Sequence, residues 1–178
     1  DKYGIEILAE TARLWMSLGF YDKAEGAFRI NGVTGPDEYT AIVNNNYFTN
    51  MMAANHLEFA AESVIKLKER DESSYRRLNR KIALSEDEPE SWLKAAAAMY
   101  LPFDDELCIN PQDDSFLKKE QWDFESTPAD KYPLLLNYHP LVIYRHQVLK
   151  QPDVVLADFL LGEKTSRITK LRNYEYYT

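Results

Sequence analysis

The residues best suited to chemistry lie in one short turn. Residues 32–39, Gly-Val-Thr-Gly-Pro-Asp-Glu-Tyr, end in two neighbouring carboxylates, Asp37 and Glu38. Gly35 permits a positive φ and Pro36 fixes φ, so the turn suits a rigid, irregular backbone that could hold an acid at the mouth of a cleft. The alternative is that Asp37 or Glu38 only caps a following helix, because acids favour a helix N-terminus. The residues alone favour the cap, because capping carboxylates outnumber catalytic ones, but they leave both interpretations open.

Other kinds of catalytic site find little support. The histidines, His56, His139 and His146, have no HExxH or CxxC companions, so we expect no metal. Cys108 is a single cysteine among scattered histidines, which is weak evidence for a thiol nucleophile. The glycines do not form a Walker or dinucleotide-binding pattern. Acid chemistry combined with polar recognition remains.

Three consecutive amides, Asn44, Asn45 and Asn46, follow the turn. Asparagine is a poor helix former and is costly to bury without a partner. We therefore expect these side chains to orient the acid's loop or to face a substrate. Local hydrogen bonding to the backbone is an equally acceptable interpretation for each one.

Two motifs carry a resemblance to a known family. The first is the turn of residues 32–39, followed by Val-Asn-Asn-Asn-Tyr at 43–47. The second is His-Pro-Leu-Val-Ile-Tyr-Arg-His-Gln at 139–147, which leads into Lys150 and Gln151. Together they resemble the disaccharide phosphorylases of glycoside hydrolase family 65, over nearly the whole chain and in the expected order.

The resemblance implies a function and a role for three residues. Glu38 would be the general acid of an inverting α-glucoside phosphorylase that converts a disaccharide and phosphate to β-glucose 1-phosphate and a sugar. Lys150 and Gln151 would bind the glucosyl unit, with inorganic phosphate as co-substrate and no cofactor. One carboxylate suffices, because phosphate is already an anionic nucleophile. Two alternatives stay open: an inverting hydrolase, which needs a second carboxylate, and a non-catalytic scaffold of helical repeats.

The family's catalytic domain is an (α/α)6 barrel, so the resemblance implies an all-α fold. We expect residues 1–178 to form about the second half of that ring, as a partial barrel with a short β-ribbon before Glu38. The remaining donor-site and phosphate-site residues would then lie outside residues 1–178. Taken alone, the chain is expected to be inactive and to form a homodimer through apolar helix faces.

The hydrophobic pattern predicts the elements that position these residues. Helix 4–18 is expected to end at Gly19, and a ribbon at 25–33 to turn at Asn31 and Gly32. A capping box, Ser85 with Glu88, is expected to open a helix that ends by Pro102, and Asp153 is expected to cap another. The loop at 102–139 is rich in proline and aromatic residues, and we expect it to be ordered. The remaining predicted helices are 41–68, one around 75–82, 140–150, 154–161 and one around 168–171.

The composition limits the class of partner. The 178 residues include 29 acidic and 21 basic side chains, for a net charge of −8. This balance argues against nucleic acid and anionic membranes, which select basic surfaces. No run is apolar enough to span a bilayer, and we expect no secretory signal. A single cysteine allows no intrachain disulfide, so a cytoplasmic location is expected.

Overall fold

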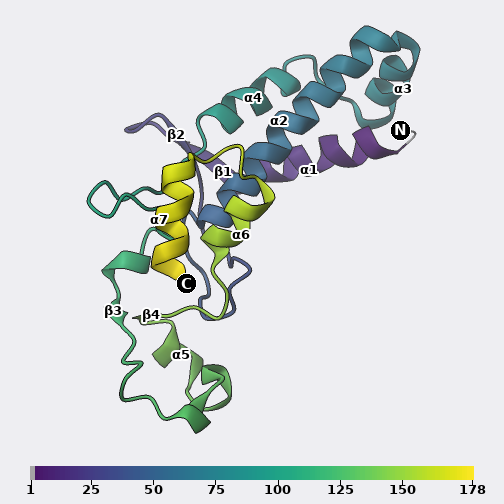
Figure 1. Cartoon of the computed structure of the whole chain (residues 1–178). Coiled ribbons are helices and arrows are strands. Elements are labelled where there is room, and N and C mark those ends of the chain that lie inside the picture. The colour runs from purple at the N-terminus through teal and green to yellow at the C-terminus, as the bar shows by residue number, and fades with distance from the viewer. Residues whose placement is uncertain (1–2) are drawn as a thin grey trace. The chain divides into compact units, whose positions relative to one another are not determined.

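The computed structural model describes residues 3–178 as two compact units. The first comprises residues 3–30 and 50–100, and the second comprises residues 31–49 and 101–178. The described chain is predominantly helical, as predicted, with a few short strands (Figure 1). None of its helices combines the length and the apolar character that crossing a membrane requires.

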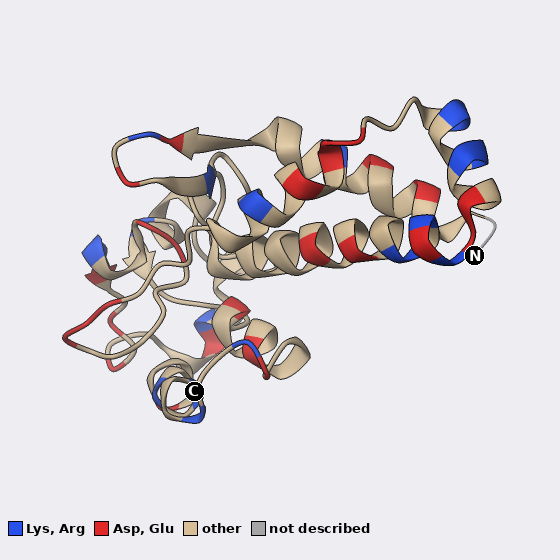
Figure 2. Cartoon of the chain, turned by 90° about the horizontal axis from the view of Figure 1, so that it is seen from above, with Lys and Arg blue, Asp and Glu red and all other residues tan. Residues whose placement is uncertain are grey.

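The first unit is built from helices and one β-ribbon. Its elements are α1 (Gly4–Leu18), β1 (Gly19–Asp22), β2 (Ala27–Ile30), most of α2 (Tyr47–Arg70), α3 (Glu72–Ile82) and α4 (Glu88–Ala97). Alanines such as Ala9, Ala60 and Ala95 are fully buried between the helices, where their small side chains allow close packing. The exposed faces mix both charges (Figure 2), with ion pairs one helical turn apart such as Lys66–Glu62.

The predicted ribbon is present before Glu38, but its turn was placed wrongly. β1 and β2 pair antiparallel with Gly19 opposite Ile30 and Asp22 opposite Ala27, so the reversal lies between them and not at Asn31 and Gly32. Gly19 ends α1 as predicted. A side chain there would also collide with Phe28, since a Cβ atom would lie 2.2 Å from its ring.

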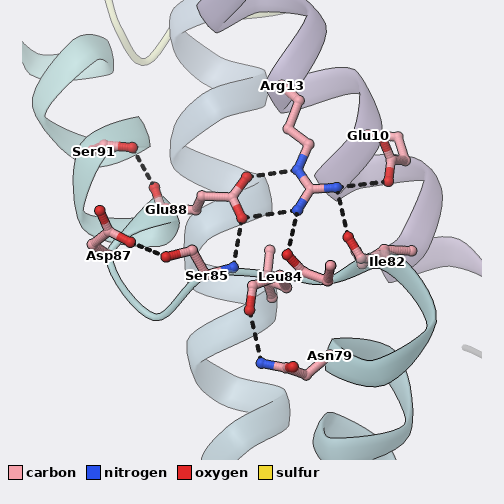
Figure 3. A network of polar contacts seen from close by, with 10 residues as sticks. Glu10, Arg13, Asn79, Ile82, Leu84, Ser85, Asp87, Glu88 and Ser91 are labelled. Carbon is pink, nitrogen blue, oxygen red and sulfur yellow. Dashed lines mark hydrogen bonds and ion pairs between the residues drawn. The ribbon is translucent and has the colours of Figure 1, made fainter.

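One arginine joins three helices of the first unit (Figure 3). Arg13 of α1 makes two bonds to the carboxylate of Glu88, 2.6 and 2.8 Å long, and donates to the carbonyl of Ile82 at the end of α3. Glu88 also accepts from the backbone of Ser85 at 2.7 Å, which is half of the predicted capping box. The other half is absent, because the Ser85 hydroxyl bonds to Asp87 instead.

The second unit consists of short helices and two short strands joined by irregular segments. The helices and strands are η1 (Phe116–Lys118), β3 (Glu120–Gln121), η2 (Ala129–Lys131), η3 (Leu134–Leu136), α5 (Pro140–Ile143), β4 (His146–Gln147), α6 (Asp153–Leu160) and α7 (Arg167–Tyr177). β3 and β4 pair in parallel, with Glu120 opposite His146. The loop at 102–139 is therefore ordered, as predicted. A hydrophobic cluster of the second unit packs the loop's Trp122 and Leu134 against Tyr39, Ile143 and Val148.

Two helix predictions need correction. The predicted helix at 140–150 ends at Ile143, because the chain then extends into β4 to pair with β3. The long helix does not begin near residue 41 but at Tyr47. Ile42 and Asn45 have φ values of 46° and 51°, which a right-handed helix cannot contain. Residues 31–46 therefore form one long turn.

Candidate active site

The long turn presents one of its two acids to solvent and buries the other. Val33 and Val43 close it with a pair of backbone hydrogen bonds of 3.0 and 2.8 Å. Asp37 is fully buried, whereas 59% of the Glu38 side chain is exposed. Since the helix that follows these two acids begins only at Tyr47, neither acid is a helix cap, and that alternative is wrong. Glu38 is thus the carboxylate of the pair that is open to solvent.

Asp37 holds the turn through its carboxylate. Its Oδ1 atom accepts from three backbone N–H groups, those of Tyr39 at 3.2 Å, Lys150 at 2.9 Å and Gln151 at 3.4 Å. Its Oδ2 atom accepts from the amide of Gln112 at 3.0 Å. A buried carboxylate is stable only when donors of this kind replace water. Here two of them belong to a segment more than one hundred residues away.

The structure brings the three predicted site residues together. The ammonium of Lys150 contacts the carboxylate of Glu38, and this hydrogen bond raises the pKa of Lys150. The side-chain amide of Gln151 donates to the carbonyl of Pro36 in the acid's turn. Lys150 and Gln151 lie in the turn between β4 and α6, not at the helix end that the sequence predicted.

Asp153, Gln112 and Asn46 complete the site, and sequence reasoning did not find their arrangement. Asp153 was predicted to cap a helix, but its Oδ1 atom accepts from the backbone N–H of Asp37 at 2.8 Å and its Oδ2 atom from the Asn46 amide at 2.9 Å. Gln112 accepts from the Asp153 backbone at 3.3 Å and donates to Asp37. Burial raises the pKa of Asp153 to about 6. Only the run of three asparagines signalled part of this network.

The asparagines show both predicted behaviours: they hold the acid's turn, and Asn44 and Asn46 do so partly through hydrogen bonds to nearby backbone. Asn44 accepts from the backbone of Gly32 at 3.1 Å, and Asn45 donates to Asp114 at 2.7 Å. Asn46 also caps α2, since its oxygen accepts from the backbone of Thr49 at 2.9 Å. Their amides therefore tie the turn to α2 and to the loop that follows α4.

Gly35 serves the turn by its size. Positive φ values occur at Gly26 and Gly32 but not at Gly35, so the predicted conformational reason is wrong. A Cβ atom at Gly35 would lie 2.1 Å from Asp153 Oδ2 and 2.5 Å from Asn46 Nδ2. Only glycine lets the backbone pass this close to the buried pair.

The ordered loop contributes a cavity in the same unit. It has a volume of about 360 Å³ and is lined by Phe116, Trp122, Phe124, Tyr176 and Leu149 among others. Leu149 directly precedes Lys150. Within residues 3–178, no group of three or more His, Cys, Asp or Glu side chains is placed to hold a metal ion.

Comparison with known proteins identifies the family. The model of the glycosyl hydrolase family 65 central catalytic domain matches residues 1–178. An α,α-trehalose phosphorylase of Geobacillus stearothermophilus is 54% identical over 176 residues, 99% of this chain and 23% of that protein. A kojibiose phosphorylase of Halothermothrix orenii is 39% identical over 99% of this chain and 23% of its own length.

A solved structure shares the fold. It is described as "Putative kojibiose phosphorylase from human microbiome" and matches with a TM-score of 0.83 at 29% identity, covering 98% of this chain and 24% of its own. The chain thus spans about a quarter of the length of the relatives that it matches. With the family model matched from end to end and these identities, the chain belongs to glycosyl hydrolase family 65, within its central catalytic domain.

Proposed function

We propose that this chain carries the general acid of an inverting disaccharide phosphorylase. The observation that supports this most is the meeting of Glu38 with Lys150 and Gln151, which come from turns more than one hundred residues apart. An acid, an ammonium and an amide at one exposed place suit a sugar, whose hydroxyl groups both donate and accept hydrogen bonds. The trehalose, kojibiose and maltose phosphorylases among the relatives supply the reaction class.

In this proposal Glu38 protonates the oxygen that leaves the anomeric carbon. The bond from that carbon to the glycosidic oxygen breaks, and the oxygen takes the electron pair together with the proton of Glu38. A phosphate oxygen forms the new bond from the opposite face, which gives β-glucose 1-phosphate and the free sugar. Lys150 and Gln151 hold the glucosyl unit, and Glu38 regains a proton before the next cycle.

The two carboxylates nearest to the acid's turn do not provide the base that a hydrolase would need. An inverting hydrolase needs a second carboxylate to activate water. Asp37 and Asp153, which lie against the acid's turn, are both fully buried and accept hydrogen bonds from backbone and amide groups. Neither is free to act as a base for water, whereas phosphate needs none.

We also propose that residues 1–178 form about the second half of an (α/α)6 barrel. The helical content and the likeness to the solved phosphorylase structure support this architecture. The full-length protein would therefore be the active form. The 54% identity to a trehalose phosphorylase makes α,α-trehalose the first sugar to test, before kojibiose and maltose.

The test is phosphorolysis by the full-length protein and its Glu38→Gln variant. Glutamine keeps the shape of the side chain but has no transferable proton, so kcat should fall by roughly 10²- to 10⁴-fold with little change in sugar binding. Glu163→Gln, an exposed glutamate between α6 and α7, is the matched control and should keep normal turnover.

The products decide between the rival reactions. Phosphate-dependent formation of β-glucose 1-phosphate, followed by NMR, is expected. Release of glucose without phosphate would instead support the hydrolase. A Glu38→Gln variant with nearly normal kcat would place the acid elsewhere.

A further inference from the structure

We infer that Asp37 is a positioning residue that fixes the acid's turn against the backbone of the sugar-binding turn. This inference rests on the proposed function of Glu38, Lys150 and Gln151. Asp37 directly precedes Glu38 in the chain, and its carboxylate accepts from the backbone N–H groups of both Lys150 and Gln151. The contact is between backbone and carboxylate, so it sets where the two turns lie whatever their side chains do.

The Asp37 carboxylate is itself held in one place. It is fully buried, and Gln112, also fully buried, donates to it at 3.0 Å. The backbone N–H of Asp37 donates to Asp153, the residue that begins α6 just after the sugar-binding turn. Asp37 thus bonds in both directions to residues 150–153. Four donors on a buried carboxylate leave it no other rotamer at comparable energy.

Positioning of this kind matters because Glu38 is on the surface. Most of its side chain is exposed, so packing does not fix it, and its main restraint besides Lys150 is the backbone of the turn. A displacement of the acid by about 1 Å can lower a rate 100-fold. Asp37 does not touch the substrate in this scheme; it acts on kcat through Glu38, whose turn it fixes to the backbone of Lys150 and Gln151.

A double-mutant cycle in the full-length protein tests the inference. Asp37→Ala removes every acceptor of the carboxylate, and we expect kcat for the disaccharide to fall about 100-fold. In a Glu38→Gln background, where no acid remains to be positioned, the same change should lower kcat less than threefold. Asp37→Asn keeps an oxygen that can accept from the backbone N–H groups of residues 150 and 151 but loses the hydrogen bond from Gln112, so it should recover part of the lost kcat.

A matched control separates positioning from general damage. Asp158 of α6 is also a buried aspartate, but it bonds to Asn173 and not to the acid's turn. Asp158→Asn should keep kcat within twofold. If Asp37→Ala does not fold, Asp37→Ser replaces it in the cycle, because its short hydroxyl cannot reach the backbone of residues 150 and 151.

The outcomes are distinct. If the effects of Asp37→Ala and Glu38→Gln on kcat multiply, Asp37 does not act through the acid and the inference is overturned. If Asp37→Asn recovers no kcat relative to Asp37→Ala, the hydrogen bonds from the backbone of residues 150 and 151 do not set kcat, which also overturns the inference. If Glu38→Gln alone keeps normal kcat, the proposed function fails, and with it the role of Asp37.

Discussion

Replacing Gly35 by alanine should destabilise the second unit through a steric effect alone. The new methyl group would lie 2.1 Å from Asp153 Oδ2 and 2.5 Å from Asn46 Nδ2, well inside contact distance. One of the two side chains must move, which breaks the 2.9 Å bond between them in a fully buried place. The φ of Gly35 is not positive, so no conformational strain adds to this effect.

The expected loss is about 3 to 4 kcal/mol. A hydrogen bond to a charged group contributes roughly 1.5–3 kcal/mol, and overpacking of a filled interior costs roughly 1–3 kcal/mol. Partial relaxation of the Asn46 amide keeps the total below the sum of the upper values. Turnover of the full-length protein should fall as well, because Asp153 bonds to the backbone of Asp37.

Gly32→Ala in the same turn is the matched control. Gly32 has a φ of 69° and open space where a Cβ atom would lie, so alanine there costs only the left-handed conformation, about 1–2 kcal/mol. The free energy of unfolding of both variants is measured by urea unfolding at pH 7.5, and local stability is measured separately by hydrogen exchange of the α6 backbone. If Gly35→Ala is no more destabilising than Gly32→Ala, the close packing of this turn against Asp153 is not what requires glycine.

Two further predictions concern charge. Burial raises the pKa of Asp153 to about 6, above about 3.9 for an unfolded aspartate, so the folded state binds this proton more tightly. Its ionisation therefore lowers the free energy of unfolding as pH rises from about 4 to 6, by about 3 kcal/mol in all. Urea unfolding over this pH range should show a smaller loss of stability in Asp153→Asn than in the wild type. An equal dependence of stability on pH in the two proteins would contradict this. In the first unit, the lysine of Arg13→Lys cannot reproduce both the paired hydrogen bonds to Glu88 and the bond to the Ile82 carbonyl. Thermal unfolding should therefore show a loss of roughly 1–3 kcal/mol in the free energy of unfolding. A stability equal to that of the wild type would show that these hydrogen bonds contribute nothing.

Much of the secondary structure could be predicted from local sequence patterns. The spacing of apolar residues over 4–18 predicts α1, because a helix that buries one face repeats its apolar residues every three to four positions. Gly19 ends this helix. The helices α3, α4, α6 and α7 follow from the same signal. The turn of residues 32–39 was recognisable from its glycines, proline and paired acids, whereas Lys150 and Gln151 were identified only by their resemblance to the family's motif.

The tertiary structure decided what those motifs do to one another. The sequence predicted Asp153 as a cap and a helix from residue 41, because local preference favours both. Contacts with distant residues prevailed: Asp153 bonds to Asp37 across 116 positions, and Gln112 to Asp37 across 75. A buried carboxylate needs hydrogen-bond donors, and the residues that provide them can lie anywhere in the sequence. The local sequence therefore does not identify them. Residue types and period are determined locally, whereas the partner of each buried polar group is determined only when the chain has folded.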